Sequence, residues 1–338
     1  MDSGGLQRFL DGVPMPALLV EGEDRILACN GLATSVFGEG MIGRNPAFAV
    51  RAPAVLEGIG LALRGAGVQQ VRMPLRRDGQ EEVFQVTVSS QDDGLVLCVF
   101  RDVGEEEKID AVRRDFVANV SHELRTPLTA LMGFIETLRN AAKDDPKARQ
   151  MFLGIMETEA GRMNRLVRDL LQLSQVEANE RVRPKDRVEL RGLLERVIGS
   201  LKGTAEKTGA RVDLTGDPVT VPGDADQLTQ VFTNLIENAL KYGGAGQVVR
   251  VSLSPEETVR GPGVRVEVAD EGEGIDPVHL PRLTERFYRV DSHRSREMGG
   301  TGLGLAIVKH IIGRHRGFLR ITSVKGEGSR FSVVLPVG

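Results

Sequence analysis

The chain has 338 residues, a length that at roughly 150 residues per domain predicts two or three domains. Hydrophobic residues at 41% and charged residues at 27% are typical of globular proteins and exclude a wholly disordered or fibrous chain. The 44 Lys and Arg residues face 47 Asp and Glu, and the net charge of −3 argues against nucleic acid as a partner. The longest apolar run, Leu95 to Phe100, falls far short of the roughly 20 residues that cross a bilayer, so we expect no transmembrane segment.

The N-terminus and the cysteine content indicate the compartment. Residues 1–5 have neither a basic region nor an apolar region, which argues against a secretory signal. The chain has two cysteines, Cys29 and Cys98, too few for a disulfide framework. We therefore expect a cytoplasmic protein.

Residues 1–103 have the pattern of a small α+β domain with an antiparallel sheet. Short apolar or alternating segments are typical of strands, and a helical stretch from Ala54 to Arg64 lies between them. The expected strands are Ala17 to Val20, Arg25 to Ala28, Val83 to Val88 and Leu95 to Phe100. The segments Ile26 to Asn30 and Phe100 to Val103 resemble strands of a PAS sensor domain. The alternative is a sheet domain used only for dimerisation or packing.

Residues 104–180 predict a helical hairpin. After the charged run Glu105 to Lys108, apolar residues recur in steps of three and four along two long segments that a break at Asp144 to Pro146 separates. The first stripe comprises Ile109, Val112, Phe116, Val120, Leu124, Leu128, Leu131, Ile135 and Leu138, and the second Phe152, Ile155, Met156, Met163, Leu166, Val167, Leu170 and Leu173. One hairpin cannot cover its own apolar face, so we expect a homodimer with a four-helix bundle.

Residues 181–338 predict an α/β sandwich that follows a charged linker, residues 178–187. Helix-like runs alternate with strand-like ones along this segment. The expected helices are Leu190 to Thr208, Asp224 to Tyr242 and Leu303 to Arg314, and the expected strands are Val248 to Leu253, Val264 to Ala269, Phe318 to Ser323 and Arg330 to Leu335.

The first long helix carries a candidate nucleophile, His122. At about 100° per residue the imidazole lies about 200° from the apolar residues Val120 and Leu124, so it points to solvent. A neutral imidazole is a competent nucleophile, and Glu123 could hold one of its ring N–H groups. Thr126 lies one turn further on the same face, where its hydroxyl could orient a water. Pro127 cannot donate to the carbonyl of Glu123, which lets the helix bend below the histidine.

Four polar residues share one face of the helix expected at Asp224 to Tyr242. Asn234, Asn238, Lys241 and Tyr242 follow i, i+4, i+7 and i+8 spacing. Amide oxygens suit Mg²⁺, and a lysine suits phosphate. A solvated helix face is the alternative interpretation.

Two glycine-containing segments complete the candidate site. Asp270 ends a strand and could accept a hydrogen bond from the exocyclic amine of adenine, which would select ATP over GTP, while Gly272 and Gly274 leave room for the base. The run Gly299 to Lys309 is a glycine-rich loop that leads into a helix, an arrangement that aims backbone N–H groups at phosphate. It lacks the Gly-Lys-Ser/Thr ending of a P-loop.

Taken in order, these segments resemble the boxes of a bacterial two-component sensor histidine kinase with a HisKA-type transmitter. The H, N, G1, F and G2 boxes correspond to Ser121 to Pro127, Asn234 to Tyr242, Asp270 to Gly274, Glu285 to Arg289, and Gly300 to Gly304. The flanks of the H box, Arg113 to Phe116 and Gly133 to Leu138, are most similar to phosphate-regulon kinases of the PhoR type. The resemblance covers about residues 105–338.

The resemblance implies a multidomain α+β protein in three parts. These are a PAS-like sensor at 1–103, a dimerisation and histidine phosphotransfer hairpin at 104–180, and a catalytic ATP-binding domain of the GHKL or Bergerat fold at 181–338. The implied partners are a second copy of the chain and the receiver domain of a response regulator. The implied cofactors are ATP and Mg²⁺.

The resemblance also implies residue roles. His122 becomes the phosphoacceptor, Glu123 its acid/base neighbour, and Thr126 the residue that orients water when the regulator is dephosphorylated. Asn238 becomes the Mg²⁺ ligand, Asp270 recognises adenine, and the segment from Arg289 to Gly302 forms a lid over ATP. The other nucleotide-contacting residues are Asn234, Lys241, Tyr242, Gly272, Gly274, Ile275, Arg289, Gly300, Thr301, Gly302, Leu303 and Gly304.

Two departures from the family pattern stand out. Glu271 occupies the position where the family usually has Asn after the adenine-binding Asp. PhoR-type kinases usually carry N-terminal membrane helices, and none is expected here, so the signal would come from the cytoplasm or from a membrane-protein partner. A shortened chain that begins at an added Met is the alternative.

The sequence thus predicts an ATP-dependent histidine kinase that phosphorylates His122, transfers the phosphoryl group to an aspartate of a response regulator, and also acts as a phosphatase of that regulator, with phosphate as a candidate stimulus. Two alternatives remain open. One is a kinase-like scaffold without turnover, against which His122, Asn238 and Asp270 argue. The other is a plain ATPase of the same nucleotide-binding fold, which would lack the hairpin.

Overall fold

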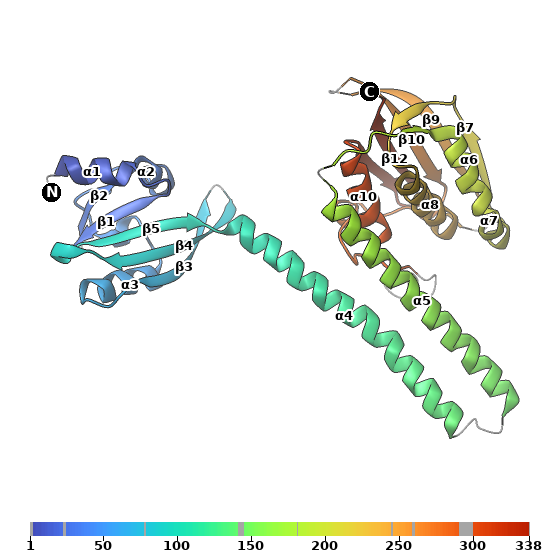
Figure 1. The fold of residues 1–338 in the computed structure, drawn as a ribbon, viewed down its shortest axis with the longest axis horizontal. Coiled ribbons are helices and arrows are strands. Elements are labelled where there is room, and N and C mark those ends of the chain that lie inside the picture. The colour runs from blue at the N-terminus through green and yellow to red at the C-terminus, as the bar shows by residue number, and fades with distance from the viewer. Residues whose placement is uncertain are drawn as a thin grey trace. The chain divides into compact units, whose positions relative to one another are not determined.

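The computed structural model describes residues 3–22, 25–77, 79–140, 145–180, 182–244, 246–258, 261–290 and 300–337. The chain forms two compact units, Met1–Ala118 and Asn119–Gly338, and helix α4 (Gly104–Arg139) contributes residues to both (Figure 1). No helix within the described ranges is long and apolar enough to cross a membrane.

The first unit is built on an antiparallel sheet of five strands in the order β2-β1-β5-β4-β3. The strands are β1 (Ala17–Glu21), β2 (Arg25–Cys29), β3 (Gln69–Arg77), β4 (Gln80–Ser90) and β5 (Val96–Asp102), and the helices are α1 (Ser3–Asp11), α2 (Gly31–Phe37) and α3 (Pro53–Leu63), with short 3-10 turns at Pro46–Phe48 and Asp92–Gly94. The antiparallel sheet and the helix near residues 54–64 are confirmed. Strand β3 was not predicted, because this edge strand is mostly exposed and contains Pro74.

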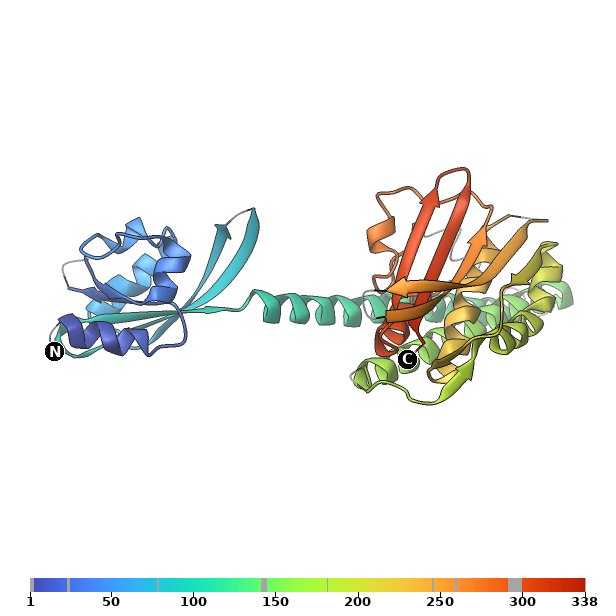
Figure 2. The same cartoon turned by 90° about the horizontal axis from the view of Figure 1, so that it is seen from above.

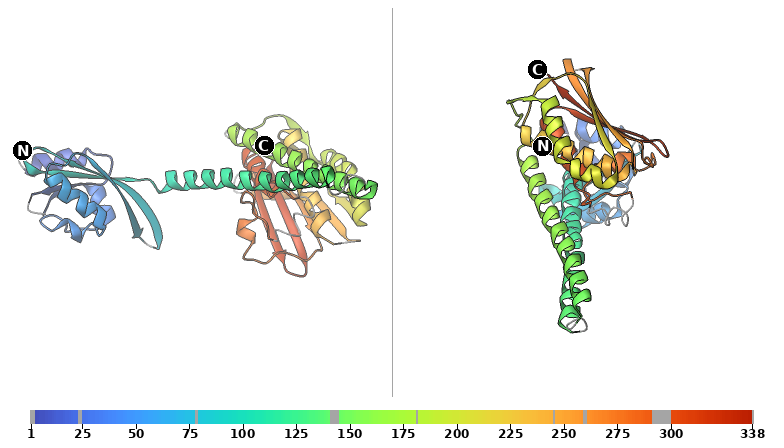
Figure 3. Two further views of the ribbon diagram at one scale, coloured as in Figure 1. Left: turned by 90° about the horizontal axis from the view of Figure 1, so that it is seen from below. Right: turned by 90° about the vertical axis from the view of Figure 1, so that its right-hand side faces the viewer.

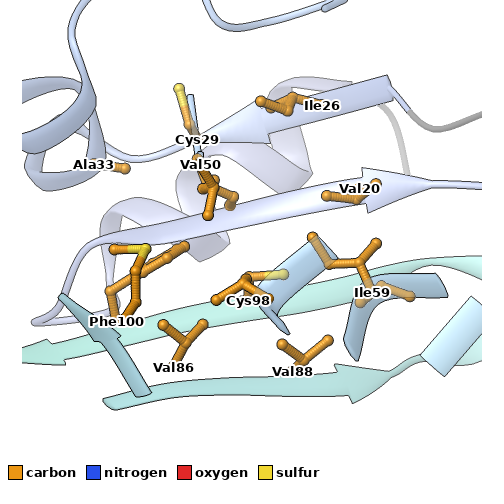
Figure 4. Packing of buried hydrophobic residues seen from close by; sticks show 14 of the residues in the cluster. Val20, Ile26, Cys29, Ala33, Val50, Ile59, Val86, Val88, Cys98 and Phe100 are labelled. Atoms are coloured by element: carbon orange, nitrogen blue, oxygen red, sulfur yellow. The ribbon is translucent and has the colours of Figure 1, made fainter. Parts of the chain in front are cut away.

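Two apolar cores cover the two faces of this sheet. The larger one packs α2 and α3 against side chains that include Val86, Cys98 and Phe100 (Figure 4). The smaller one places Leu10 of α1 against Ala17, Leu19 and Ala28 on the opposite face. Cys29 and Cys98 are free and buried, and burial raises the pKa of the Cys98 thiol to about 12. Both cysteines therefore serve as small apolar core residues.

The second unit begins with the hairpin of α4 and α5 (Pro146–Ala178). Asp145 caps α5 by accepting hydrogen bonds from the backbone N–H groups of Lys147 and Ala148. The two helices run side by side (Figure 3), and the ring centroids of Phe134 and Phe152 lie 5.4 Å apart between them. The predicted hairpin is therefore present, and residues 141–144, which include part of the expected break, lie outside the described residues.

Large apolar side chains remain exposed on both helices in the single chain. They include Leu128, Met132 and Ile135 on α4 and Met151, Leu153, Ile155, Val167 and Leu171 on α5. An exposed apolar stripe of this kind is what the predicted four-helix bundle would bury. The dimer itself stays a prediction.

The rest of the second unit is an α/β sandwich (Figure 2). A five-stranded sheet has the order β11-β12-β10-β9-β7, in which only β7 and β9 are parallel. Its strands are β7 (Arg211–Thr215), β9 (Val248–Thr258), β10 (Gly261–Asp270), β11 (Phe318–Val324) and β12 (Gly328–Pro336); a second, two-stranded sheet pairs β6 (Arg187–Glu189) with β8 (Thr220–Pro222). The packed helices are α6 (Leu190–Ser200), α7 (Lys202–Thr208), α8 (Ala225–Tyr242) and α10 (Gly304–Arg314).

The four longer strands and the α8 and α10 helices match the sequence expectation, with two differences. The helix expected from Leu190 to Thr208 is broken at Leu201, which ends α6 and begins α7. Strands β6, β7 and β8 were not expected, because each has at most five residues and only one or none fully buried. Short strands of this kind give too few positions for an alternating pattern.

Candidate active site

A cavity of about 1410 Å³ lies within the second unit. Side chains from α5, α8, the end of β10, the segment Leu283 to Val290 and the loop before α10 line it. The cavity therefore gathers the N, G1, F and G2 segments of the sequence analysis into one place.

Helix α8 supplies one wall, because its two faces have different roles. Leu228, Val231, Phe232, Leu235, Ile236, Ala239 and Leu240 are buried in the sandwich core. The opposite stripe, Asn234, Asn238, Lys241 and Tyr242, lines the cavity as the spacing predicted. Asn234 donates from Nδ2 to the carbonyl oxygen of Gly304 at 3.2 Å, and Lys241 forms an ion pair with Glu237 at 2.9 Å. These residues line a cavity and Tyr242 is 38% exposed, so their role in ligand binding stays a prediction.

Asp270 ends β10 and is 8% exposed. Burial raises the pKa of its carboxyl group, and hydrogen bonds from the backbone of Gly272 and Ser329 oppose that shift. Oδ1 accepts the Gly272 N–H at 3.0 Å, which fixes the carboxylate at the cavity wall. A carboxylate held in this way is suited to accept a hydrogen bond from a base amine.

The glycines of the G1 segment are required by the protein's own backbone. A Cβ at Gly272 would lie 2.4 Å from the carbonyl oxygen of Tyr242, and one at Gly274 would lie 2.0 Å from that of Val324. Gly274 also has φ 63°, in the left-handed region. The next residue, Ile275, lines the cavity and donates its N–H to Ser323 Oγ at 2.7 Å. Gly272 is not among the lining residues, so its role is to let β10 turn against α8.

The F segment (residues 285–289) and the G2 segment (residues 300–304) contact each other through their backbones. Phe287 N–H donates to the carbonyl oxygen of Gly302 at 2.9 Å, and both residues have positive φ, 64° and 73°. A Cβ at Gly302 would lie 2.9 Å from the Phe287 Cα. Gly300, Thr301, Gly302 and Gly304 line the cavity, whereas Leu303 is fully buried beneath it.

The guanidinium group of Arg289 belongs to the same region. Its nitrogens have almost no exposed surface, and the residue lines the cavity. A buried guanidinium group beside a glycine loop suits an anionic ligand. Most of the expected lid, residues 291–299, lies outside the described residues.

Helix α5 contributes a wall of the cavity that the sequence did not predict. Asp169 Oδ2 accepts a hydrogen bond from Thr301 Oγ1 at 2.7 Å. Burial raises the pKa of the Asp169 carboxyl group, while the hydrogen bond from Thr301 and the charges of Arg165 and Arg168 lower it. Further along α5, Gln172 hydrogen-bonds Gln230 of α8.

The end of α5 is held by Glu177, which pairs with Arg286 and lies 3.5 Å from His310 Nε2. Nothing in the local sequence pattern marks Asp169, Gln172 or Glu177, because each meets a partner more than 50 residues away in the chain. Their roles follow only from the fold.

His122 lies on α4 and does not line the cavity. Its side chain is exposed, as predicted, and α4 continues through the buried Pro127. Thr126 Oγ1 donates to the carbonyl oxygen of His122 at 3.2 Å. Glu123 accepts a hydrogen bond from Arg162 of α5 at 2.9 Å, so the described structure pairs this carboxylate with a guanidinium group across the hairpin.

Glu271, the unusual residue after Asp270, points toward the surface. Its carboxylate pairs with Arg250 at 2.7 Å, and both side chains are more than half exposed. The substitution therefore leaves the carboxylate of Asp270 in place.

Asn234 and Asn238 offer amide oxygens at the cavity wall, where Asp169, Glu237, Asp270 and Glu273 add carboxylate oxygens. Within the described ranges no group of three or more His, Cys, Asp or Glu side chains could hold a metal ion. Asn238, with Asn234 one turn away, lines the cavity beside the glycine loop. One or two protein oxygens together with phosphate and water oxygens fit Mg²⁺, which retains most of its water and phosphate ligands in such sites.

Comparison with known families agrees with this geometry. The model described as "His Kinase A (phospho-acceptor) domain" matches residues 112–179, and the model described as "Histidine kinase-, DNA gyrase B-, and HSP90-like ATPase" matches residues 223–338. These two matches cover the helical hairpin and most of the sandwich.

Individual relatives are similar over the same region. The phosphate regulon sensor protein PhoR of Pseudomonas aeruginosa is 42% identical over 250 residues, which are 74% of this chain and 55% of the relative. The sensor protein kinase WalK of Staphylococcus aureus is 37% identical over 249 residues, which are 73% of this chain and 60% of the relative. The matched region thus spans little more than half the length of these relatives.

A solved structure has a similar fold along almost the whole chain. The crystal structure of histidine kinase ThkA in complex with response regulator protein TrrA gives a TM-score of 0.52 at 19% identity and covers 98% of both chains. At this identity the likeness concerns the fold alone. The two domain matches and the identity with the PhoR and WalK relatives place the chain in the family of bacterial two-component sensor histidine kinases, and within it the chain is PhoR-like.

Proposed function

We propose that the chain transfers the γ-phosphoryl group of ATP to His122. The observation that carries this proposal is the combination, in one chain, of a cavity built from the ATPase boxes and an exposed histidine on a helical hairpin. Neither feature alone would distinguish a kinase from a plain ATPase or a scaffold.

The residues around the cavity have distinct tasks in this proposal. Asp270 accepts a hydrogen bond from the adenine amine, since its carboxylate is fixed by Gly272. Arg289 and the loop Gly300 to Gly304 bind the phosphates, and Lys241 adds a positive charge. Asn238 would hold Mg²⁺, which when bound neutralises phosphate charge.

In the transfer step one imidazole nitrogen of His122 attacks the γ-phosphorus. The N–P bond forms as the bond between the γ-phosphorus and the bridging oxygen breaks, and ADP leaves with the electron pair. In the second step a carboxylate oxygen of an aspartate on a response regulator receiver domain attacks the phosphorus and releases the imidazole. The ThkA structure, solved with a response regulator protein, supports this kind of partner.

We also propose a homodimer, a PAS-like sensor role for the first unit, and phosphatase activity that depends on Thr126. Exposed apolar side chains along α4 and α5 support the dimer. The five-stranded antiparallel sheet with helices on both faces supports a sensor-like fold. Phosphate limitation is the first stimulus to test, because a phosphate regulon sensor protein is 42% identical.

Incubation with γ-labelled ATP and Mg²⁺ tests the proposal. We expect acid-labile label on the protein and its transfer to one response regulator in a panel from the same organism. Free phosphate without labelled protein would identify a plain ATPase. The absence of both products would identify a scaffold.

A further inference from the structure

Helix α5 contacts the glycine-rich loop through Asp169, which accepts the hydroxyl proton of Thr301. Thr301 Oγ1 donates to Asp169 Oδ2 at 2.7 Å and accepts the N–H of Leu303 at 3.3 Å. A hydroxyl group has a single proton. If the Thr301 hydroxyl donates to a phosphate oxygen, its hydrogen bond to Asp169 is therefore lost.

The same carboxylate places negative charge in the wall of the cavity. Asp169 lines the cavity together with Thr301, and Glu237 of α8 is close enough to act on it as a second negative charge. Arg165 and Arg168 of α5 offset part of this negative charge, Arg289 also lines the cavity, and Lys241 is paired with Glu237. Any polyphosphate bound by the loop Gly300 to Gly304 would lie close to this carboxylate, and like charges at short range repel.

Two other polar residues of α5 contact the sandwich away from the glycine-rich loop. Gln172 binds Gln230, and Glu177 binds Arg286 and lies 3.5 Å from His310. Of these described contacts, the one made by Asp169 lies directly on the glycine-rich loop.

We propose that Asp169 sets the affinity of the cavity for polyphosphate: its carboxylate binds Thr301 and opposes the phosphates, so that phosphate binding by the loop and docking of α5 on the loop oppose each other. This inference rests on the proposed function, because it takes the cavity to be the ATP site. Linkage makes the effect reciprocal, so a bound triphosphate weakens the contact with α5 as much as that contact weakens triphosphate binding. ATP binding would then loosen the helix whose hairpin carries His122.

The first test removes the charge and keeps the shape. Asp169→Asn retains an oxygen that can accept from Thr301 but is neutral. In the full-length chain with Mg²⁺, calorimetry should show about tenfold tighter binding of ATP, which lies within the usual range of coupling between sites. Adenosine binding should change less than twofold, because it lacks phosphates.

The adenosine measurement also shows that the variant is folded. Unchanged ATP affinity, or an equal change for ATP and adenosine, would overturn the inference. If the wild-type chain does not bind ATP at all, the proposed function is wrong. This outcome differs from one in which the wild-type chain binds ATP and Asp169→Asn has no effect, which contradicts only the role of Asp169.

The second test follows the docking of α5 directly. Gln172→Cys introduces a thiol at the partly buried contact with α8, while the native Cys29 and Cys98 are buried in the first unit. ATP should speed maleimide labelling of the introduced thiol several-fold, and adenosine should not. Ser174→Cys, at an exposed position on the same helix, is the matched control and should label at one rate throughout. Labelling of the Gln172→Cys variant that ATP slows or leaves unchanged would contradict the proposal.

Discussion

The nucleotide cavity and the His122 segment, residues 121–127 of α4, differ in how closely other elements pack around their side chains. The cavity takes residues from α5, α8, the end of β10 and two loops. Its lining residue Gly274 has no room for a side chain, since a Cβ there would lie 2.0 Å from the carbonyl oxygen of Val324. The segment around His122 comes from α4 alone, and the side chain of His122, the proposed phosphoacceptor, is exposed. A binding site of fixed geometry and an accessible nucleophile are what a reaction with two successive partners needs. Substitutions in the two regions should therefore fail in different ways.

The largest expected effect is the loss of autophosphorylation without a loss of ATP binding. His122→Ala should abolish autophosphorylation, while ATP affinity stays within a few-fold, because His122 does not line the cavity. Acid-labile label and calorimetric ATP binding are measured on the same preparation. His310→Ala, which removes the α10 histidine that lies 3.5 Å from Glu177 of α5, is a control that should keep the label. Persistent label on the His122 variant would assign the phosphoacceptor to another residue.

Loss of the amide at Asn238 should affect the cavity alone. Asn238→Ala should lower Mg²⁺-dependent autophosphorylation by about hundreds-fold, since the metal neutralises charge in phosphoryl transfer. The rate is measured over a Mg²⁺ titration. Asn164→Ala, at an exposed position of α5, removes a similar amide and should leave the rate unchanged. Equal rates in wild type and the Asn238 variant would exclude a metal-binding role.

The contact between Phe287 and Gly302 tests whether the cavity depends on backbone fit. Gly302→Ala forces a Cβ to within 2.9 Å of the Phe287 Cα at φ 73°. Backbone strain of this kind costs about 1–3 kcal/mol, so ATP should bind about tenfold or more weakly. Gly326→Ala is the matched control, since Gly326 has φ 89° with nothing within 4 Å of the added Cβ. That variant should lose a little stability and keep its ATP affinity, and a similar loss of affinity in both would exclude the fit argument.

The same contrast explains what could be predicted from the sequence. The side chains of α8 share one helix, so their spacing placed Asn234, Asn238 and Lys241 on one face without any knowledge of the fold. Asp270 was predictable because a strand leads directly into a glycine turn. Asp169 was not, because it meets Thr301 across 132 residues of sequence. Edge strand β3 was missed although Val71, Met73 and Leu75 alternate with polar residues and Pro74, because a proline within the run argues against a strand.

A smaller effect concerns the second activity proposed for the His122 segment. Thr126→Ala should keep autophosphorylation, because attack by the imidazole on ATP needs no water, but should lose most of the acceleration of regulator dephosphorylation. The decay of purified phosphorylated regulator is measured with wild type, Thr126→Ala and Thr126→Ser, and the serine variant should behave as wild type. Since Thr126 also donates to the His122 carbonyl, loss of both activities would show that its hydroxyl serves the helix instead.

The smallest expected effect lies in the packing beneath the cavity, at His315. This residue is fully buried, and its Nε2 accepts the N–H of Asp224 at 3.0 Å while Nδ1 donates to the carbonyl oxygen of Ile311 at 2.7 Å. Burial lowers its pKa; the hydrogen bond to Ile311 and the charge of Asp224 act in the opposite direction, and Arg314 and Arg183 lower the pKa further. The neutral ring is therefore part of the cap of α8, the helix that carries Asn234 and Asn238.

Because the folded-state pKa lies below the unfolded value of about 6.5, the unfolded chain takes up this proton first as the pH falls. The contribution of His315 to stability is present above about pH 6.5 and declines below it, by at most about 1.4 kcal/mol per pH unit for one proton. Urea unfolding at pH 7.5 and 5.5 measures the decline. His315→Gln should be less stable at pH 7.5 yet lose less between the two pH values than wild type does. An equal decline in both proteins would assign the acid sensitivity to other groups and leave α8 capped independently of pH.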